Sequence, residues 1–200
     1  DVHPDQIPWN VAIPAEILQQ AIEENLPAPS KIIDIGCGAG NYVIWFAKNG
    51  YEMTGVDISQ NAIEIARRSA STAGASCKFI VADAIADLPT SDGMFDFAYD
   101  WELLHHIFPE DRDRYIRNVA RVLKPGGRYL SVCFSEDDPA FGGVGKFRKT
   151  RLDTTLYFSS EKELRELFGR YFVVEDLKTV DITGKNIVHK AIYALMKKSS

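Results

Sequence analysis

The chain lacks any run of about 18 consecutive apolar residues, which a membrane-spanning helix requires. It also lacks a basic excess, because 23 lysines and arginines stand against 28 acidic residues. The resulting net charge of -5 argues against a broad electrostatic contact with nucleic acid, whose protein partners are basic. No signal peptide is visible in the first residues. We therefore expect a cytoplasmic protein that contacts neither a membrane nor nucleic acid.

Cysteine is scarce too, with only Cys37, Cys77 and Cys133 in 200 residues. Three widely spaced cysteines predict neither a disulfide framework nor a metal centre, so we expect no bound metal and a reducing environment. The rest of the composition, 46% hydrophobic and 26% charged, is typical of a globular protein with a sizeable core. We expect one domain over residues 1–200, present as a monomer or a homodimer.

Strand-like and helix-like segments alternate along the chain. We predict strands at Lys31–Ile35, Glu52–Val56, Cys77–Ala82, Met94–Tyr99 and Arg128–Phe134, and helices at Pro14–Asn25, Asn41–Asn49, Ser59–Ala73 and Glu110–Leu123. The runs Tyr171–Val180 and Ile187–Met196 predict a terminal hairpin around Gly184. This alternation predicts an α/β fold with a parallel sheet covered by helices on both faces. Ligands of such sheets bind beyond the carboxyl ends of the strands.

Three successive predicted strands end in an acid, at Asp34, Asp57 and Asp83. Parallel strands place their carboxyl ends on one edge, so the three carboxylates are expected to converge there. The alternative is that each acid only caps the helix or turn that follows it. For Asp57 we prefer the first interpretation, because Ser59 is better placed to cap the next helix.

Three glycines follow the first predicted strand directly, at Gly36, Gly38 and Gly40. Without a Cβ, such a loop turns sharply and lets a ligand approach the backbone closely. The spacing departs from the dinucleotide fingerprint G-x-G-x-x-G, which would require glycine at Asn41. Asp57 lies about 20 residues beyond the loop, where an acid can bind a ribose diol. The pattern therefore predicts a cofactor that contains a nucleoside.

Four segments together resemble the motif series of class I S-adenosylmethionine-dependent methyltransferases. They are Asp34–Gly40 (DIGCGAG), Gly55–Ile58 (GVDI), Val81–Ala84 (VADA) and Leu123–Leu130 (LKPGGRYL). The resemblance implies a Rossmann-like, doubly wound sheet of seven strands in the order 3-2-1-4-5-7-6, with the last strand antiparallel. It also implies that the chain is an enzyme that transfers a methyl group from S-adenosylmethionine.

The resemblance further implies which residues bind the cofactor. The loop with Gly36, Cys37, Gly38 and Gly40 would pass under the methionine part, and Asp34 would steady that loop and the amino group. We read Cys37 itself as a small residue that fits a tight loop.

At the other end of the cofactor, the resemblance implies that Asp57 accepts from the ribose diol and that Ile58 packs against the adenine. Asp83 would accept from the adenine amino group beside Ala84. Near the methionine end, the contacts would come from Asp100 and Trp101, which follow the fourth strand.

The stretch after the fourth predicted strand, Tyr99–His106, reads YDWELLHH and contains no Asn/Asp-Pro-Pro-Tyr/Phe motif. Since that motif accompanies methylation of amide or nucleobase nitrogen in this family, we expect a small-molecule acceptor. A thiol, halide, metalloid, oxygen or amine nucleophile remains open. The reaction needs mainly alignment, because the sulfur leaves as a neutral group. A base is required only for an acceptor that carries a proton.

We expect the acceptor pocket to be formed by an N-terminal lid, residues 1–29, and by an inserted loop, residues 135–158. Trp9 matches a tryptophan that lies near the cofactor in the thiopurine, halide and tellurite methyltransferases, although simple core packing explains it as well. The loop carries Arg148 and Arg151, either of which would bind an anionic acceptor. The alternative is a solvated charged loop.

Four further residues are expected to line or serve the acceptor pocket: His105, Asp100, Phe134 and Phe141. His105 is the candidate proton acceptor, against the alternative of a packed histidine. Two alternative functions remain open, a nicotinamide-dependent oxidoreductase and a non-catalytic subunit that binds S-adenosylmethionine. Asn41, in place of the third fingerprint glycine, disfavours the first.

Overall fold

The computed structural model describes residues 11–150, 153–183 and 187–199. Its strands are β1 (Lys31–Ile35), β2 (Glu52–Asp57), β3 (Lys78–Val81), β4 (Phe95–Trp101), β5 (Leu123–Phe134), β6 (Phe147–Lys149), β7 (Thr155–Tyr157), β8 (Phe172–Thr183) and β9 (Val188–Lys198). Its helices are α1 (Glu16–Glu23), α2 (Asn41–Lys48), α3 (Gln60–Ala73), α4 (Pro109–Val122) and α5 (Glu161–Phe168), with a 3-10 turn η2 (Leu104–His106).

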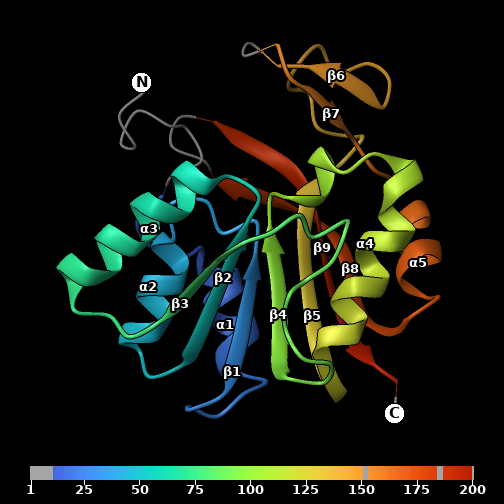
Figure 1. Cartoon of the computed structure of the whole chain (residues 1–200). Coiled ribbons are helices and arrows are strands. Elements are labelled where there is room, and N and C mark those ends of the chain that lie inside the picture. The colour runs from blue at the N-terminus through green and yellow to red at the C-terminus, as the bar shows by residue number, and fades with distance from the viewer. Residues whose placement is uncertain (1–10, 151–152, 184–186, 200) are drawn as a thin grey trace.

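Seven strands form one sheet in the order β3-β2-β1-β4-β5-β9-β8, which confirms the predicted fold and strand order (Figure 1). Strands β3, β2, β1, β4 and β5 are parallel neighbours, and β9 pairs antiparallel with both β5 and β8. The carboxyl ends of the five parallel strands therefore lie on one edge of the sheet. We call this edge the rim.

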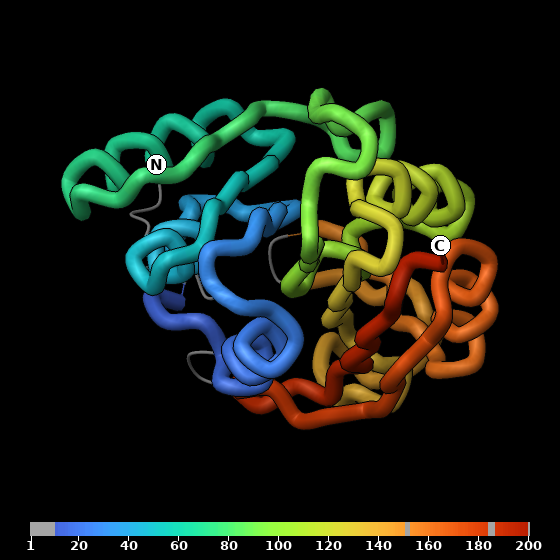
Figure 2. Tube along the Cα trace, turned by 90° about the horizontal axis from the view of Figure 1, so that it is seen from below, coloured from blue at the N-terminus to red at the C-terminus, as the bar shows by residue number. Residues whose placement is uncertain are grey.

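Helices cover both faces of the sheet. On one face, α1, α2 and α3 bury apolar side chains such as Leu18, Phe46 and Ile63. On the other face, α4 and α5 bury Tyr115 and Phe168 against β4 and β5. Figure 2 shows α4 and α5 side by side, in yellow and orange, on the opposite side of the molecule from α3. The two layers hold the strands, and with them the rim, in a fixed geometry.

The N-terminal segment differs from the expected lid. In α1, Leu18 and Ile22 are fully buried in the same cluster as Ile32 and Phe97, so this helix is part of the core layer. Val11 lies close to the rim, because its carbonyl accepts a hydrogen bond from Asn41 Nδ2 at 3.2 Å. A lid role is thus restricted to residues before α1. Trp9 and Arg151 lie outside the described residues, as does Gly184.

The segment expected to be an inserted loop contains regular structure. β6 and β7 pair antiparallel, with Arg148 opposite Leu156, and the hairpin stands above the rim (Figure 1). The helix that follows, α5, was not predicted. Its N-terminal signal is a capping box, in which Ser160 Oγ accepts from Glu163 N at 3.2 Å and Ser160 N donates to the Glu163 carboxylate.

Two boundaries differ from the sequence-based prediction. β5 begins at Leu123 instead of Arg128, and its pairing with β4 shifts register between Phe95 and Phe97. The predicted turn at residues 124–127 lies at this irregularity, with Gly126 in a left-handed conformation (φ 74°). No helix within the described ranges is long and apolar enough to cross a membrane.

Candidate active site

The glycine loop, residues 36–40, joins β1 to α2 and is bound to the end of β2. Gly36 N donates to the carbonyl of Val56 at 2.7 Å, and Gly38 N donates to Asp57 Oδ2 at 2.9 Å. All three glycines have positive φ, a conformation that other residues adopt only with strain. A Cβ on Gly38 would meet no atom of the described residues within 4 Å, whereas one on Gly40 would lie 2.7 Å from Phe79. Gly40 thus serves packing, and Gly38 is open on this side as far as the described residues go.

Cys37 points into the protein from this loop. A Cβ at Gly55 would lie only 2.8 Å from Cys37 Sγ, so the thiol fills the space that Gly55 leaves. Burial, together with the charges of Asp34 and Asp57, raises the pKa of the Cys37 thiol. A neutral, packed thiol is a poor nucleophile. The structure therefore supports the interpretation of Cys37 as a small residue in a tight loop.

Asp57 and Asp83 lie at the ends of β2 and β3. The two ends are held together by a hydrogen bond from Ala82 N to the Asp57 carbonyl at 3.0 Å. The Asp57 carboxylate accepts from Gly38 N and, at 2.8 Å, from Ser59 N. Asp83 is exposed and its carboxylate accepts from Ile85 N at 2.9 Å. Each carboxylate keeps lone pairs for a ligand, so local capping and ligand binding are compatible.

An exposed apolar side chain follows Asp57. Ile58 is 70% exposed, and Ser59, not Asp57, caps α3 by accepting from Ala62 N at 3.2 Å. An exposed isoleucine between a carboxylate and a helix start offers an apolar surface for a flat ring. We call the glycine loop together with Asp57, Ile58 and Asp83 the β1–β3 rim.

Asp34 is buried beneath the glycine loop and accepts a hydrogen bond from the Tyr99 hydroxyl at 2.9 Å. Burial, with smaller contributions from the charges of Asp57 and Asp100, raises the pKa of Asp34 to about 8. The hydrogen bond from Tyr99 opposes this shift. A cation bound nearby would favour the ionised carboxylate, so the arrangement fits the amino group of a methionine moiety.

The side chain of Asp100 is fully buried and does not reach the rim. Strand alternation places Tyr99 on the Asp34 side of the sheet and Asp100 on the opposite side, facing α4. Its carboxylate accepts from the hydroxyls of Tyr115, Tyr129 and Ser131. Burial raises the pKa of Asp100 to about 6 despite these bonds. We predicted that Asp100 contacts the cofactor or acts in catalysis. For its carboxylate this prediction is wrong, because the group is bound inside the protein.

Trp101, the last residue of β4, shares the other face with Tyr99. Its ring contacts Tyr42 of α2 edge-to-face, with 6.3 Å between ring centroids. Tyr42 lies one residue into α2, directly after the glycine loop. Trp101 and Tyr42 thus stand together at the methionine end of the proposed cofactor site.

His105 is buried in η2 and packs flat on Phe134, with ring centroids 4.1 Å apart and planes 2° from parallel. Its Nδ1 accepts a long hydrogen bond, 3.4 Å, from Phe134 N, which assigns the ring proton to Nε2. Burial and the nearby His106 and Arg112 lower the pKa of His105 well below its ordinary value. A ring that accepts through Nδ1 and carries a proton on Nε2 has no free site for a substrate proton. His105 is the packed histidine of the alternative interpretation.

Arg148 is also buried, and four of its five N–H groups are taken up by the backbone of the same segment. Its guanidinium donates to the backbone carbonyls of Glu136, Asp138, Ala140 and Gly145. It also covers the ring of Phe158, with 4.0 Å from Cζ to the ring centroid. The prediction that Arg148 binds an anionic acceptor is wrong, because the side chain instead fixes the fold of residues 136–148.

Phe134 and Phe141 come together near the end of β5. Their ring centroids are 6.3 Å apart, and both rings contact His189 of β9. Asp138, which is buried, holds this segment against β9 by accepting from Lys190 N at 2.6 Å. The expected neighbourhood of His105, Phe134 and Phe141 therefore exists as a packed aromatic cluster. We call residues 101–106 and this cluster the β4–β5 rim.

One residue of the β4–β5 rim was missed by sequence reasoning. Glu102 follows β4 directly, has a left-handed backbone (φ 63°), and is partly buried. Burial raises the pKa of its carboxyl to about 7. The available signal was its place between two residues that were named, Trp101 and His105, because an acid at the end of a parallel strand points to function.

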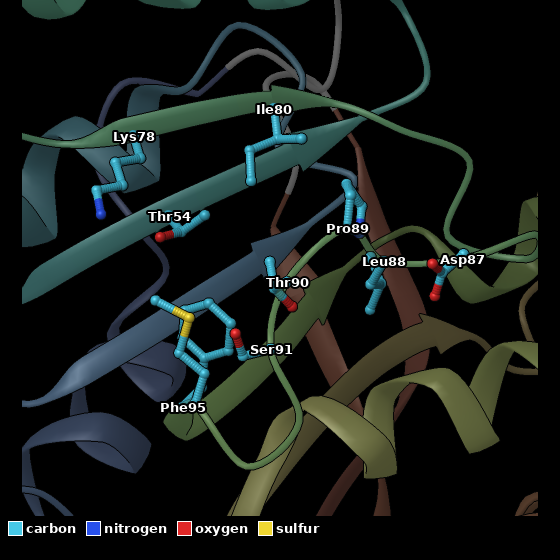
Figure 3. A pocket seen from close by; sticks show the side chains of 10 residues that line it. Thr54, Lys78, Ile80, Asp87, Leu88, Pro89, Thr90, Ser91 and Phe95 are labelled. Carbon is cyan, nitrogen blue, oxygen red and sulfur yellow. The ribbon is translucent and has the colours of Figure 1, made fainter.

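A cavity of about 510 Å³ lies elsewhere, on the α4 side of the sheet (Figure 3). Its lining includes Thr54 of β2, Lys78 of β3 and Pro89. No helix covers the face of β2 and β3 here, because residues 82–94 connect β3 to β4 without one in the described structure. Thr54 and Lys78 lie in the amino-terminal halves of their strands, so the cavity is separate from the rim.

Comparisons with known proteins agree with the fold and the rim. A family model described as a methyltransferase domain matches residues 32–127. A 2-heptyl-1-hydroxyquinolin-4(1H)-one methyltransferase of Mycobacteroides abscessus is 29% identical over 171 residues, which cover 85% of this chain and 70% of that protein. The chain spans between 29% and 53% of the length of other curated relatives that it matches.

Solved structures show the same fold. A SAM-dependent methyltransferase of Methanosarcina mazei superposes with a TM-score of 0.80 at 24% identity, over 92% of this chain and 98% of that one. A 1,6-didemethyltoxoflavin-N1-methyltransferase of Burkholderia thailandensis, solved with 1,6-didemethyltoxoflavin and S-adenosylhomocysteine, superposes with a TM-score of 0.74 at 21% identity. That alignment covers 92% of this chain and 78% of the Burkholderia protein.

The sheet order, the glycine loop and the acids at the strand ends define a Rossmann-like protein with a site for an adenosyl cofactor. The match to a methyltransferase domain over residues 32–127, the methyltransferase relatives and the structural neighbours together support a class I S-adenosylmethionine-dependent methyltransferase. S-adenosylmethionine is the cofactor of this family. The nicotinamide-dependent alternative is set aside.

Proposed function

We propose that the chain transfers the methyl group of S-adenosylmethionine to a small-molecule nucleophile by in-line displacement. The observation that carries the proposal is the bond from Gly38 N to Asp57, beside open space at Gly38. This arrangement leaves a bare backbone bend next to a carboxylate at the end of β2. Such a site fits a nucleoside with a polar extension.

Each half of the cofactor has residues that would hold it. Asp57 would accept from the ribose hydroxyls, Ile58 would pack on the adenine, and Asp83 with Ala84 would receive the adenine edge. The glycine loop would support the methionine part above Asp34, and Trp101 with Tyr42 would enclose its end. When bound, the cofactor supplies an electrophilic methyl group whose leaving sulfur is neutral.

The protein's own contribution is mainly position. A displacement of this kind is accelerated by holding the nucleophile in line with the methyl group and by excluding water. The aromatic cluster of Phe134 and Phe141 stands at the neighbouring strand end and would form an apolar wall for the acceptor. The relatives support a small acceptor, since the names of two of them specify a hydroxyquinolinone and a toxoflavin precursor.

A thermal-shift series tests the cofactor part of the proposal. A ligand at 100 times its dissociation constant adds about 2.7 kcal/mol to the free energy of unfolding. We expect S-adenosylhomocysteine and S-adenosylmethionine to raise the melting temperature and NAD to leave it unchanged. A rise with NAD alone would contradict the proposal.

A screen with radiolabelled methyl groups tests turnover. Pools of amines, phenols, thiols and halides are offered with labelled S-adenosylmethionine, and extractable label is counted. Transfer to one pool supports an enzyme. Cofactor binding without transfer to any pool favours the alternative, a non-catalytic subunit that binds S-adenosylmethionine.

A further inference from the structure

Glu102 occupies a position between the glycine loop and β5. Its backbone N donates to the Val132 carbonyl at 2.8 Å, which extends the pairing of β4 and β5 by one residue. The next residue, Leu103, covers the glycine loop so closely that a Cβ on Gly36 would lie 2.9 Å from Leu103 Cδ1. Glu102 therefore lies at the end of β4, next to the residue that covers the glycine loop.

The backbone of Glu102 is strained. A φ of 63° is left-handed, a conformation that glycine adopts freely and glutamate does not. Strain of this kind is retained where the side chain has a task that glycine cannot perform. A carboxylate therefore stands at a position whose backbone shape would suit glycine better.

The carboxyl group of Glu102 has no hydrogen-bond or ionic partner among the described residues. The other acids at this end of the sheet are satisfied: Asp34 by Tyr99, Asp100 by three hydroxyls, and Asp138 by backbone N–H groups. Among the described residues only Thr90 has a buried side-chain oxygen or nitrogen without a partner, so the Glu102 oxygens reach solvent and are open to a ligand.

Two observations describe the surroundings of the Glu102 carboxyl. Burial alone accounts for the raised pKa of its carboxyl, with no opposing or supporting charge. The titratable group that faces it is Tyr42 of α2, whose pKa is raised by burial and by the charges of Glu102 and Asp34. The Glu102 carboxyl is therefore largely desolvated and lies near the Tyr42 hydroxyl.

No free cation of the described chain faces this point. Arg148 is bound by four carbonyls, and Arg112 donates to Ile107 O, Leu104 O and Ser159 Oγ. Lys146 is paired with Glu136 at 3.1 Å and with Glu163. An acidic, cation-free site repels a halide or a thiolate and attracts a group that carries a proton.

We propose that Glu102 is a catalytic residue that accepts the proton of the methyl acceptor, and that this acceptor is a neutral nitrogen or oxygen nucleophile that carries a proton. The inference rests on the proposed function and deepens it. As the new bond to the methyl carbon forms, the carbon–sulfur bond breaks and its electron pair stays on sulfur. The proton that leaves nitrogen or oxygen passes to the Glu102 carboxylate and then to water, so charge and atoms balance.

The test compares three variants of the full chain. Glu102→Gln keeps the size of the side chain and removes the base. Glu102→Gly removes the side chain and relieves the backbone, so its melting temperature is expected to equal or exceed that of the wild type. Asp153→Asn is the matched control, because Asp153 is also left-handed (φ 59°) and its carboxylate is exposed, with Lys149 as its ion-pair partner among the described residues.

Methyl transfer is measured with tryptamine, aniline and 4-methylphenol as proton-bearing probes, and with iodide and 2-mercaptoethanol as comparisons. We expect the wild type to methylate a proton-bearing probe, with a rate that rises with pH through a limb near neutrality. Glu102→Gln and Glu102→Gly should lower kcat at least about 100-fold and abolish this limb. Asp153→Asn should retain the kcat and the pH limb of the wild type. In every variant the dissociation constant for S-adenosylhomocysteine should stay within about threefold of the wild-type value.

Other outcomes overturn the inference. Methyl transfer to iodide or to the thiol alone would exclude the proposed class of acceptor, a nitrogen or oxygen nucleophile that carries a proton. If Glu102→Gln kept its rate and pH limb but weakened S-adenosylhomocysteine binding tenfold, Glu102 would belong to the cofactor site.

If the wild type binds S-adenosylhomocysteine but methylates no probe, the carboxyl ¹³C shift of Glu102 is titrated in that complex. A pKa that stays raised supports the inference, and an ordinary value near about 4.3 overturns it. Absence of S-adenosylhomocysteine binding by the wild type would instead refute the proposed function.

Discussion

The two halves of the rim are built differently. In the β1–β3 rim, backbone amides and carboxylates stand directly at the ends of their strands and bond locally to one another, as Gly38 N does to Asp57. In the β4–β5 rim, the buried ring of His105 is bound to Phe134 N, from the end of another strand, and Asp100 just below the rim is bound to Tyr115 and Tyr129. Glu102 is the exception there, with a carboxyl that no described residue satisfies.

This difference separates two kinds of information in a sequence. A strand end, a glycine loop and the acid after the next strand are local features, so their spacing is enough to place them. Whether Asp100 or Arg148 is available to a ligand depends on partners far along the chain. The β1–β3 rim would therefore serve the shared cofactor, and the β4–β5 rim would select a particular acceptor.

The largest expected effect is on the cofactor side, at Asp57. In Asp57→Ala the acceptor of two ribose hydroxyls and of Gly38 N is lost. Hydrogen bonds to a charged group contribute about 1.5–3 kcal/mol each, so S-adenosylhomocysteine affinity should fall at least about 100-fold. Isothermal titration calorimetry measures it, with Asp181→Ala on β8 as the control. Affinity within threefold of the wild type would break the assignment of the β1–β3 rim.

On the acceptor side, the next effect is on stability. In Arg148→Ala, the carbonyls of Glu136, Asp138, Ala140 and Gly145 lose their donor, and the free energy of unfolding should fall by about 2–4 kcal/mol. Arg148→Lys should recover little, because lysine lacks the planar fork. Urea denaturation measures both, and S-adenosylhomocysteine affinity should not change. Unaltered stability with a raised KM for an anionic acceptor would restore a binding role for Arg148.

A smaller effect concerns pH and the buried acid beneath the glycine loop. The pKa of Asp34 is raised to about 8 in the folded chain, above its value of 3.8 when unfolded. Between these values the folded state holds a proton that the unfolded state has lost, so this contribution to stability falls as pH rises from 4 to 8. Asp34→Asn should flatten the dependence by on the order of 1 kcal/mol per pH unit. Parallel curves for wild type and variant would contradict the shift.

The smallest expected effect is at His105. The ring is neutral and its Nδ1 is bound to Phe134 N, so it takes no proton from an acceptor. His105→Phe keeps the ring stacked on Phe134. It should leave in place the rise of kcat with pH near neutrality. The comparison with Glu102→Gln, which should remove the limb, separates the two candidates directly. Loss of the limb in His105→Phe alone would return the base role to histidine.

Much of the fold follows from local signals. The strands that precede Gly36 and Asp57, the cap at Ser59 and the stop at Gly74 were predicted and occur within a residue or two of the expected positions. The helix α5 was missed because its apolar face is short, although the capping box of Ser160 and Glu163 marks its start.

The acceptor side was predicted less well because tertiary contacts decide it. Nothing near Arg148 in the sequence indicates that its guanidinium binds four backbone carbonyls. Similarly, the partners of Asp100 come from α4 and β5, and only strand alternation hinted that Tyr99 and Asp100 face opposite sides. Glu102 stands out because its backbone is left-handed and its carboxyl has no partner among the described residues. Neither property can be read from the amino-acid sequence.

The central claim is that an adenosyl cofactor lies across the ends of β3, β2 and β1 with its reactive end toward β4. A crystal structure with S-adenosylhomocysteine tests it most directly. We predict ribose hydroxyls within hydrogen-bond distance of Asp57 and the sulfur on the side of the glycine loop that faces Glu102. A ligand bound instead in the cavity lined by Thr54, Lys78 and Pro89, with the rim empty, would contradict it.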